Sequence, residues 1–188
     1  MGYFSAKPTL VGDRVLLRPF APADIERMGP ILADPDVLRL TGSVTSTAAA
    51  EGRSPELDER TRAWYESRVD QPDRLDLAVV DRGRDVCVGE VVLNELDEAN
   101  DACSFRVLIG PDGRDRGLGT ESIRLLLDHA FAATPLHRVE LGVYAFNPRA
   151  LRVYERAGFR LEGTRRDALR FDGERVDEHI LSVLRTDR

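Results

Sequence analysis

The sequence is poor in the residues that build metal centres and disulfide frameworks. It contains 2 cysteines and 3 histidines in 188 residues. Cys87 and Cys103 each lie in an apolar, strand-like run, which favours two buried thiols over a disulfide or a pair of metal ligands. Because no cluster of ligand residues surrounds them in the sequence, we predict no metal site.

Long apolar runs are missing, and lysine is almost absent. No run reaches the roughly 18 apolar residues of a membrane-spanning helix, and residues 1–10 lack the pattern of a signal peptide. Lys7 is the only lysine, and the net charge of −6 argues against a nucleic-acid-binding protein. We therefore expect a cytoplasmic protein with no membrane or nucleic-acid partner. It should fold as one domain over 1–188, with 1–12 as an N-terminal extension.

The most informative segment is a glycine-rich turn, RDRGLGT, at 114–120. An apolar run at 105–109 precedes it, and a periodic helical segment at 121–133 follows it. Glycine lets backbone amides approach a ligand, and the first turn of a helix offers unpaired N–H groups and partial positive charge. Arg114 and Arg116 add donors for phosphate oxygens. The segment therefore predicts a site for a ligand that carries a pyrophosphate.

Two familiar phosphate-binding loops do not fit this turn. A nucleoside-triphosphatase loop needs Lys-Ser or Lys-Thr after its glycines, and that pair is absent. A dinucleotide fingerprint needs a third glycine, but Ser122 stands at that position, although Glu140 lies where the ribose-binding acid would fall. The pattern that remains is Arg-x-x-Gly-x-Gly, from Arg114 to Gly119.

A second motif, NPRALRVYERAGF, occupies 147–159 and follows an apolar, strand-like run at 139–146. Asn147 is expected to cap a helix whose first position is Pro148, and Gly158 is expected to end it. Tyr154 lies on the same helix face as Leu151. The pattern of this segment is Asn-x-x-Ala-x-x-x-Tyr-x-x-x-Gly-Phe.

Together the two motifs resemble the signature of the GNAT acyltransferases, which bind acetyl-coenzyme A. The tail at 161–164 and 172–177 resembles the closing hairpin of one branch of that superfamily. This branch holds the ribosomal-protein N-terminal acetyltransferases of the RimJ/RimL type, together with spermidine and other small-amine acetyltransferases. The resemblance is specific over 105–184 and looser over 14–34. It implies an N-acetyltransferase that moves an acetyl group from acetyl-CoA to a primary amine.

Hydrophobic periodicity predicts the order of the elements. Strands are expected at 15–18, 75–80, 87–96, 102–109, 138–145, 159–169 and 175–184, and helices at 22–33, 55–69, 121–133 and 148–157. The segment 34–47 is expected to be irregular. This order matches an α/β fold. The resemblance implies the GNAT architecture, a central mixed seven-stranded sheet with splayed fourth and fifth strands, flanked by about four helices.

The resemblance also implies which residues bind acetyl-CoA. The splay would admit the pantetheine arm, and a backbone amide there could stabilise the thioester oxygen as it becomes an oxyanion. The arm would pair with the backbone of Val107, Leu108 and Ile109. The pyrophosphate would lie against Arg114, Arg116, Gly117, Leu118, Gly119 and Thr120. The remaining candidates are Asn147 for the arm, and Arg149 and Arg156 for the adenosine phosphates.

The expected chemistry is direct attack by a neutral amine on the thioester, without a covalent acyl-enzyme. Tyr154 is the candidate acid, because a phenol of pKa near 10 can protonate a departing thiolate whose thiol pKa is about 8.5. The identity of the base stays open. Some family members carry a glutamate at the position of Gly142, and the nearest acids here are Glu140, on the same strand face, and Glu90, on a central strand.

The basicity of the acceptor bears on this missing base. A peptide α-amine has a pKa of about 7.7–8.0 and is partly neutral near pH 7.5, whereas deprotonating an amine of pKa near 10.4 costs about 3–4 kcal/mol. We therefore expect a peptide N-terminal α-amine as the acceptor.

Two other interpretations stay open. The first is a polyamine, an amino sugar or another small amine, which would be favoured by acids converging on the acceptor groove, such as Asp34, Asp36, Glu51 or Glu56. The second is an acyl-CoA-binding sensor without catalytic activity. A homodimer is compatible with the family resemblance.

Overall fold

The computed structural model describes residues 2–188, which form one mixed sheet of eight strands in the order β1-β2-β3-β4-β5-β6-β8-β7. Neighbouring strands are antiparallel except β5 and β6, which run parallel. The strands are β1 (Leu10–Val11), β2 (Val15–Arg18), β3 (Leu75–Asp81), β4 (Val86–Asp97), β5 (Ala102–Ile109), β6 (Arg138–Tyr144), β7 (Arg160–Phe171) and β8 (Glu174–Leu184).

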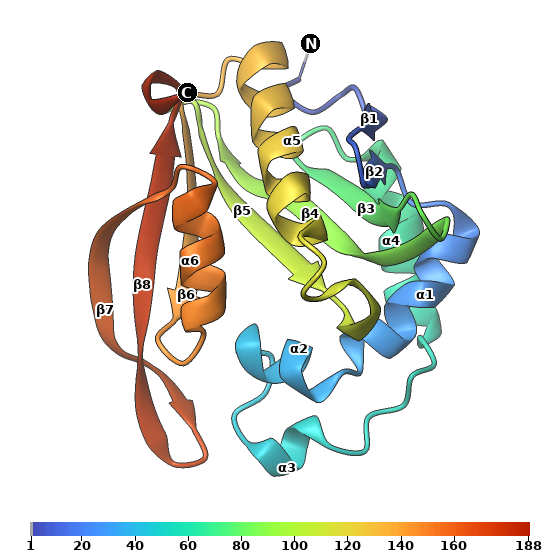
Figure 1. The fold of residues 1–188 in the computed structure, drawn as a ribbon, viewed down its shortest axis with the longest axis vertical. Coiled ribbons are helices and arrows are strands. Elements are labelled where there is room, and N and C mark those ends of the chain that lie inside the picture. The colour runs from blue at the N-terminus through green and yellow to red at the C-terminus, as the bar shows by residue number, and fades with distance from the viewer. Residues whose placement is uncertain (1) are drawn as a thin grey trace.

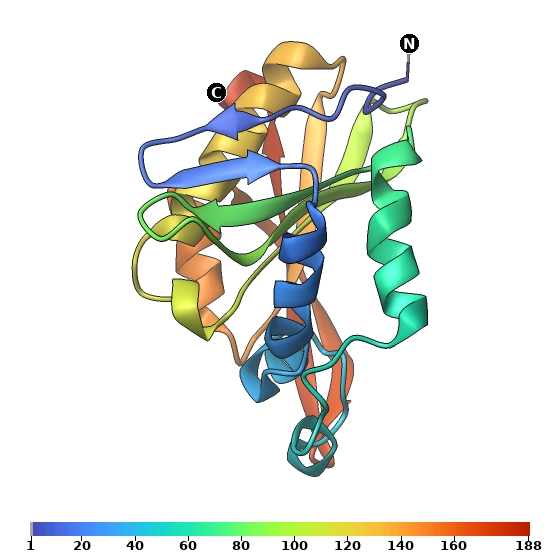
Figure 2. The ribbon, with the colours of Figure 1, turned by 90° about the vertical axis from the view of Figure 1, so that its right-hand side faces the viewer.

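Helices cover both faces of this sheet, as Figures 1 and 2 show. Helices α5 and α6 lie on one face, and α1 and α4 lie on the other. The helices of the described chain are α1 (Pro22–Leu32), α2 (Pro35–Leu40), α3 (Thr47–Ala50), α4 (Glu59–Glu66), α5 (Leu118–Ala133) and α6 (Pro148–Arg156). Short 3-10 turns occupy Ser67–Asp70, Pro111–Gly113 and Arg185–Asp187.

The core forms where the sequence patterns bury apolar side chains. The stripe of α5, from Ile123 to Phe131, packs against alternate residues of β6, namely Val139, Leu141 and Val143. Strand β3 is buried along its whole length, as expected for a central strand that is covered on both faces. On the opposite face, α1 and α4 contribute Met28 and Tyr65 to a second cluster.

The parallel pairing of β5 with β6 is unusually short. It comprises three residue pairs, from Ala102 with Arg138 to Ser104 with Glu140. Beyond these pairs the two strands diverge, as Figure 1 shows, and within residues 2–188 no other strand fills the space between them. The fold is therefore the mixed sheet with two splayed strands that the sequence predicts.

The strand count is one higher than predicted. Leu10 and Val11, in the expected N-terminal extension, form β1 and pair with Leu17 and Leu16 of β2. A strand of two residues leaves no recognisable alternation in a sequence. The splayed strands are consequently the fifth and sixth in chain order.

The helices differ more from prediction. The segment 34–47, expected to be irregular, contains α2 and the start of α3, because the Asp34 side chain accepts a hydrogen bond from the amide of Val37 and Pro35 occupies the first turn. The helix expected from Pro55 begins at Glu59 instead. Its cap is Asp58, which accepts from the amide of Thr61, whereas Ser54 accepts from Glu56 in a local turn.

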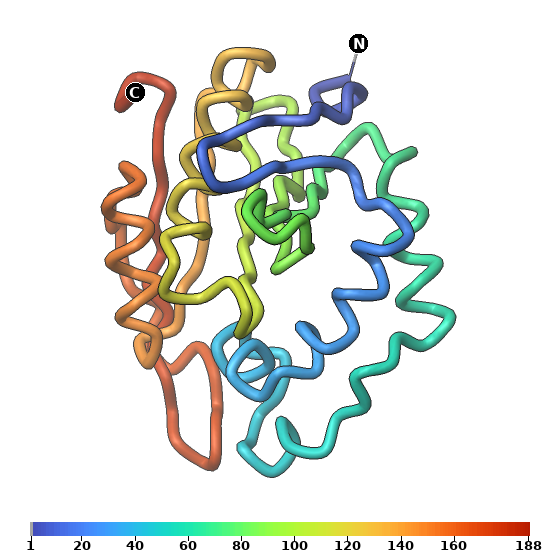
Figure 3. Tube along the Cα trace, turned by 45° about the vertical axis from the view of Figure 1, so that its right-hand side comes forward, coloured from blue at the N-terminus to red at the C-terminus, as the bar shows by residue number. Residues whose placement is uncertain are grey.

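The hairpin of β7 and β8 reaches across to α3, and Figure 3 shows its tip beside that segment. Asp172 accepts hydrogen bonds from the backbone amide (2.8 Å) and the hydroxyl (2.6 Å) of Thr47. Beneath this link, Phe171 packs with Val44 and Ala50 in a small apolar cluster. The hairpin and the α2–α3 segment are thereby joined at the wide end of the splay.

Two further expectations concern membranes and thiols. Within residues 2–188, every helix is too short or too polar to cross a bilayer. Cys87 and Cys103 are buried free thiols, as the sequence predicts, and burial raises the pKa of each to about 12.

Candidate active site

A cavity of about 720 Å³ occupies the space between the splayed strands. Residues 105–109 of β5 and residues 140–144 of β6 form two of its walls. Helices α2, α5 and α6 and parts of β4, β7 and β8 also contribute to the lining. Because β5 has lost its neighbour beyond Ser104, residues 107–109 have no strand partner on that side, and the carbonyl of Ile109 accepts a hydrogen bond from Arg114 instead.

The glycine-rich turn forms one end of the cavity. Gly117 adopts a left-handed conformation (φ 76°, ψ 0°) as the N-cap of α5, and Gly119 and Thr120 follow it in the first turn. All three residues line the cavity. The amides of a first helical turn have no partner within the helix and lie at the positive end of its dipole. The side chain of Leu118, between the two glycines, is buried in the core, so only its backbone is available to a ligand.

Two of the four predicted arginines, Arg114 and Arg149, line the cavity, and each already forms an ion pair with a carboxylate of the protein. Arg114 donates to the carboxylates of Asp34 and Asp36 and to the carbonyl of Ile109, which ties the turn to α2. Arg149, at the start of α6, pairs with Asp115 at 2.9 Å. An anion that enters here would compete with these carboxylates for the guanidinium groups.

The other two arginines lie outside the lining. Arg116 pairs with Asp81 at the end of β3 and donates to the carbonyl of Asp112, so its guanidinium points away from the cavity. Arg156 is exposed near the end of α6, where its carbonyl accepts from Arg124. The sequence places both residues near the motifs, but it does not show which way their side chains turn.

Asn147 and Tyr154 both line the cavity from the side of α6. Asn147 is the predicted N-cap, because its side chain accepts a hydrogen bond from the amide of Ala150 (3.1 Å). Tyr154 is 8% exposed, and burial raises its pKa to about 12. Its ring packs edge-on against Phe105 and Phe159, and its hydroxyl makes no hydrogen bond with any described residue. The hydroxyl is therefore free to meet a ligand in the cavity.

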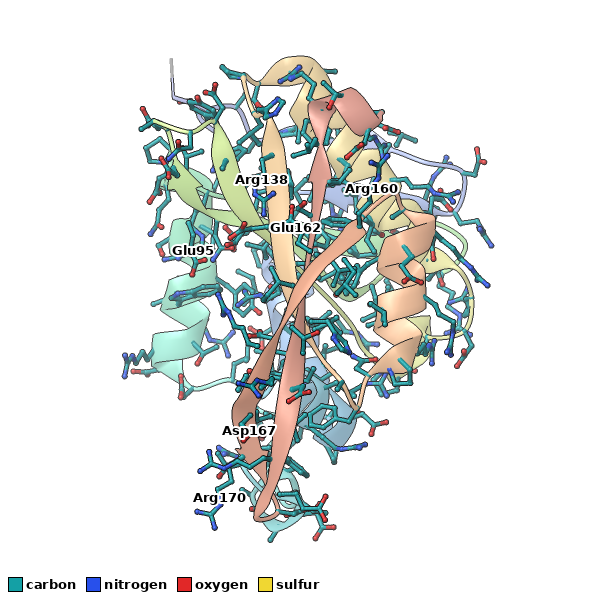
Figure 4. The ribbon with its side chains drawn as sticks, turned by 90° about the vertical axis from the view of Figure 1, so that its left-hand side faces the viewer. Glu95, Arg138, Arg160, Glu162, Asp167 and Arg170 are labelled. Carbon is teal, nitrogen blue, oxygen red and sulfur yellow. The ribbon has the colours of Figure 1, made fainter. Side chains whose placement is uncertain are left out.

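The two predicted base candidates differ in their access to the cavity. Glu140 lines the cavity, but its carboxylate pairs with Arg138 at 2.8 Å. Arg138 also pairs with Glu162, and Figure 4 labels both of these residues. Glu90 lies outside the lining and is 1% exposed. It accepts from Tyr65 (3.1 Å) and Arg106 (3.2 Å), and burial raises its pKa. The structure therefore does not bring Glu90 to the cavity.

Residues from both faces of the sheet line the cavity. Successive residues of a strand point to opposite faces, and Val139, Leu141 and Val143 are packed on the face of α5 and α6. Glu140, Gly142 and Tyr144 consequently point to the face of α1 and α4. Leu141 and Val143 of the first set and all three residues of the second line the same cavity, together with Tyr154 from α6. A ligand held on one face can thus meet a second ligand on the other.

Sequence reasoning missed the contribution of the hairpin. Glu178 and Ile180 of β8 and Arg165 of β7 line the cavity on the face of Glu140. Strand alternation predicts that Glu178 and Ile180 share a face, but it does not show that β8 lies beside β6. Within residues 2–188, no group of acidic, histidine or cysteine side chains is arranged to hold a metal ion.

Comparison with protein families identifies residues 14–160 as matching the acetyltransferase (GNAT) domain. One relative, described as probable N-acetyltransferase YjcK of Bacillus subtilis, is 29% identical over 124 residues, which cover 65% of this chain and 68% of the relative. Another, spermidine N(1)-acetyltransferase of Vibrio cholerae, is 28% identical over 108 residues, covering 57% and 62% of the two chains. The matches thus span about two thirds of these relatives.

Solved structures share the fold. A GNAT-family acetyltransferase from Bacillus anthracis superposes with a TM-score of 0.78 at 21% identity, covering 95% of this chain and 99% of the other. A spermidine N-acetyltransferase from Vibrio cholerae, solved in complex with CoA and spermine, gives a TM-score of 0.79 at 20% identity, covering 94% and 98%. At this level of identity, the likeness speaks for the fold alone.

Proposed function

Because the chain belongs to the GNAT acetyltransferase family, it is an acetyltransferase, and we propose that it transfers the acetyl group of acetyl-CoA directly to a primary amine. The observation that carries this proposal is one cavity that joins an uncapped helix N-terminus to an unpaired strand edge. The first feature suits a diphosphate, and the second suits an extended arm that carries amide groups.

In this proposal the donor lies along β5 and the first turn of α5. The amides of Gly117, Leu118, Gly119 and Thr120 hold the pyrophosphate, and Arg114 and Arg149 turn to it from their carboxylate partners. The backbone of Val107–Ile109 pairs with the pantetheine arm, which Asn147 approaches from the other wall. Arg116 and Arg156 take no part, because their side chains lie outside the cavity.

Tyr154 acts as the acid that protonates the departing thiolate. Its hydroxyl is free of intramolecular partners among the described residues and lies on the α6 side of the cavity, where the donor arm would run. Burial raises its pKa to about 12, so the phenol is fully protonated at neutral pH and has a proton to give. The thiolate is a good leaving group, so no acyl-enzyme is needed.

A peptide N-terminal α-amine is the acceptor class that we place first. Charges in the described cavity lining are balanced, with Glu95, Asp115, Glu140 and Glu178 set against Arg106, Arg114, Arg149 and Arg165. Such a lining offers no strongly anionic channel for an acceptor with several positive charges. In addition, Asp34 and Asp36 are occupied by Arg114 and do not form an acidic groove. An α-amine, partly neutral near pH 7.5, needs less help in losing its proton.

A small polyamine is the second candidate acceptor. It is favoured by the relative and the solved structure that are named as spermidine acetyltransferases. On the acceptor face, Glu95, Glu140 and Glu178 would meet its ammonium groups once the phosphates of the donor had taken up Arg114 and Arg149.

A thiol-release assay with acetyl-CoA tests the proposal and separates these acceptors. The panel contains a short peptide with a free N-terminus, the same peptide with a blocked N-terminus, and spermidine. We expect release with the free peptide and none with the blocked peptide. Faster turnover of spermidine would assign the second acceptor class, and no release with any amine would contradict the proposed transfer.

A further inference from the structure

Gly142 of β6 lies on the acceptor face of the cavity, and the space above it is filled by another strand. A Cβ atom built on Gly142 would lie 2.2 Å from Oε1 and 2.8 Å from Cδ of Glu178. Glu178 belongs to β8, where it pairs in register with Tyr144, two residues beyond Gly142. Its carboxylate thus occupies the place that a side chain at residue 142 would take.

This position lies within the splay. The pairing of β5 with β6 ends at Glu140, so Gly142 is already on the part of β6 that has left β5. Glu178 lines the cavity and is 18% exposed on its side chain. Tyr154 lines the same cavity from the opposite face of the sheet. The carboxylate of Glu178 and the phenol of Tyr154 therefore lie on opposite faces of the sheet, and both residues line the cavity between β5 and β6.

Other carboxylates near the cavity are engaged or set back. Glu90 is sealed beneath Tyr65 and Arg106. Glu140 sits at the last paired residue of β6 and is held by Arg138. Glu95 accepts a short hydrogen bond from Ser104 (2.6 Å). Glu178 has one ion pair, at 3.2 Å, with Arg165, whose side chain is 69% exposed. It is therefore held by a single solvent-exposed partner, beside the part of β6 that has left β5.

We propose that Glu178 accepts the proton of the attacking amine. This inference rests on the proposed acetyl transfer and names the base of that same site. The amine nitrogen bonds to the carbonyl carbon of the thioester, and the carbon–sulfur bond breaks. The proton lost by nitrogen passes to the Glu178 carboxylate, while the thiolate takes a proton from Tyr154. Exchange with solvent then restores both groups, and the products are an N-acetyl amine and a free thiol.

The first test compares Glu178→Gln with Glu174→Gln, a change of the same kind at an exposed position of the same strand. Both are assayed with acetyl-CoA and the free peptide or spermidine. We expect kcat for Glu178→Gln to fall about 10²-fold, the lower end of general-base effects, with an unchanged Kd for CoA, while Glu174→Gln keeps the wild-type rate. Wild-type turnover in Glu178→Gln, or the same loss in Glu140→Gln instead, would overturn the assignment.

The pH dependence separates catalysis from a structural role. As the pH rises, hydroxide in the solvent increasingly takes the proton from the attacking nitrogen in place of the carboxylate that Glu178→Gln lacks. The ratio of wild-type to Glu178→Gln rates should therefore shrink with increasing pH. A ratio that stays constant from pH 6.5 to 9.5 would indicate a structural defect and would count against the proposal.

A second variant moves the carboxylate from one strand to the other. Glu178→Ala removes it, and Gly142→Glu in the same chain supplies it from β6, where the loss of the Glu178 side chain leaves room. We expect the turnover of the double variant to be at least tenfold higher than that of Glu178→Ala alone. No recovery in a variant that still binds CoA would contradict the proposal. If the wild-type chain binds CoA but acetylates no amine, the proposed function itself fails, and the two failures remain distinct.

Discussion

At the residue scale, the two ends of Tyr154 lie in different surroundings. The ring is packed against Phe105 and Phe159, which fixes its direction, while the hydroxyl reaches the cavity without a protein partner among the described residues. Removing the oxygen alone would leave the packing intact. The residue therefore allows the chemical role to be tested separately from the structural one.

Tyr154→Phe should lower kcat by about 10²-fold or more, because the departing thiolate loses its acid. Binding of CoA, measured by calorimetry, should change little, and so should the melting temperature. Tyr3→Phe is a suitable control, since that hydroxyl bonds Asp101 and neither residue lines the cavity. Equal turnover in Tyr154→Phe and the wild type would remove the phenol from the mechanism.

The two glycines of the turn at 114–120 differ in backbone conformation. Gly117 has φ 76°, so an alanine there would be strained by about 1 kcal/mol, and its Cβ would lie 3.0 Å from the guanidinium of Arg14. Gly119 has ordinary φ, and a Cβ there would make a normal contact with Ile109 at 3.4 Å. The fold itself therefore tolerates an alanine at residue 119, and a Cβ there would obstruct only a ligand that approaches the backbone closely.

Gly119→Ala should therefore fold with wild-type stability but bind CoA about tenfold or more weakly, a loss of roughly 1.4 kcal/mol. Gly117→Ala should lose both stability and affinity. Gly52→Ala provides the matched control, because Gly52 has φ 70° with open space around it, so only strain is added. Urea unfolding and calorimetry measure the two effects. Unchanged affinity in Gly119→Ala would argue against a pyrophosphate at this turn.

Individual side chains show where sequence reasoning ends at this scale. The cap at Asn147 and the left-handed Gly117 follow from local rules of helix termini, which the neighbouring residues alone determine. The direction of the Arg116 side chain does not follow from local rules, because its partner Asp81 lies on a strand 35 positions earlier in the chain. Glu178 was missed for the same reason, since its neighbour Gly142 lies on another strand.

At the scale of the elements, a small ionic network joins β6, β7 and the face of β8. Arg138 bridges Glu140 and Glu162, and Ser182 donates to Glu162 (2.6 Å). The hydrogen bond from Arg138 has the largest effect, followed by that from Ser182, and together they lower the pKa of Glu162 from its ordinary value of 4.5 to about 2. The ionised form is thus favoured in the folded state.

This shift predicts a loss of stability in acid. Above about pH 4.5 Glu162 is ionised in both states and its stabilising effect is complete, and as the pH falls from 4.5 towards 2 the unfolded chain takes up the proton first. With 42% of the side chain exposed, solvent screening limits the effect to roughly 0.5–1 kcal/mol. Urea midpoints at pH 6 and pH 3 should therefore differ less in Glu162→Gln than in the wild type, and an identical difference would contradict the assignment.

Helices with a long repeat of apolar residues could be predicted from the sequence, and short helices without one could not. Helix α5 has a stripe of five apolar residues, and the described structure buries all of them, from Ile123 to Phe131. Helices α2 and α3 have 6 and 4 residues, too few to repeat a stripe, so their caps at Asp34 and Ser46 were the only signals. For α4, a plausible cap at Ser54 competed with the true cap at Asp58, and local sequence does not rank them.

At the scale of the whole molecule, the sheet is two half-sheets that meet over three residue pairs at one end. At the other end the hairpin tip is tied to α3 through Asp172 and Thr47. Between these links lies the cavity, so a ligand that bridges both walls adds contacts to each half. Binding should therefore stabilise the domain as a unit.

CoA at about 100 times its Kd should stabilise the folded state by about 2.7 kcal/mol. For a domain of this size, that corresponds to a rise in melting temperature of about 5–10 °C. Pantetheine, which has the arm without the phosphates, should give a much smaller rise at the same concentration. Scanning calorimetry checks both ligands, and an equal rise with pantetheine would move the main binding contacts away from the turn at Gly117.

The overall architecture could be predicted because the two motifs mark a strand–turn–helix unit on each side of the splay. The position of the last hairpin could not, since β8 inserts between β6 and β7 and reverses the chain order of the final strands. Nothing local in the sequence encodes that exchange. The wall of the cavity that the hairpin supplies was accordingly the least predictable part of the candidate site.

The gap in the sheet has a consequence for kinetics. A molecule bound along α5 and a molecule bound beside β8 would lie on opposite faces of the sheet, and direct transfer needs both at the same time. Initial-rate plots against one substrate, at several fixed concentrations of its partner, should therefore intersect.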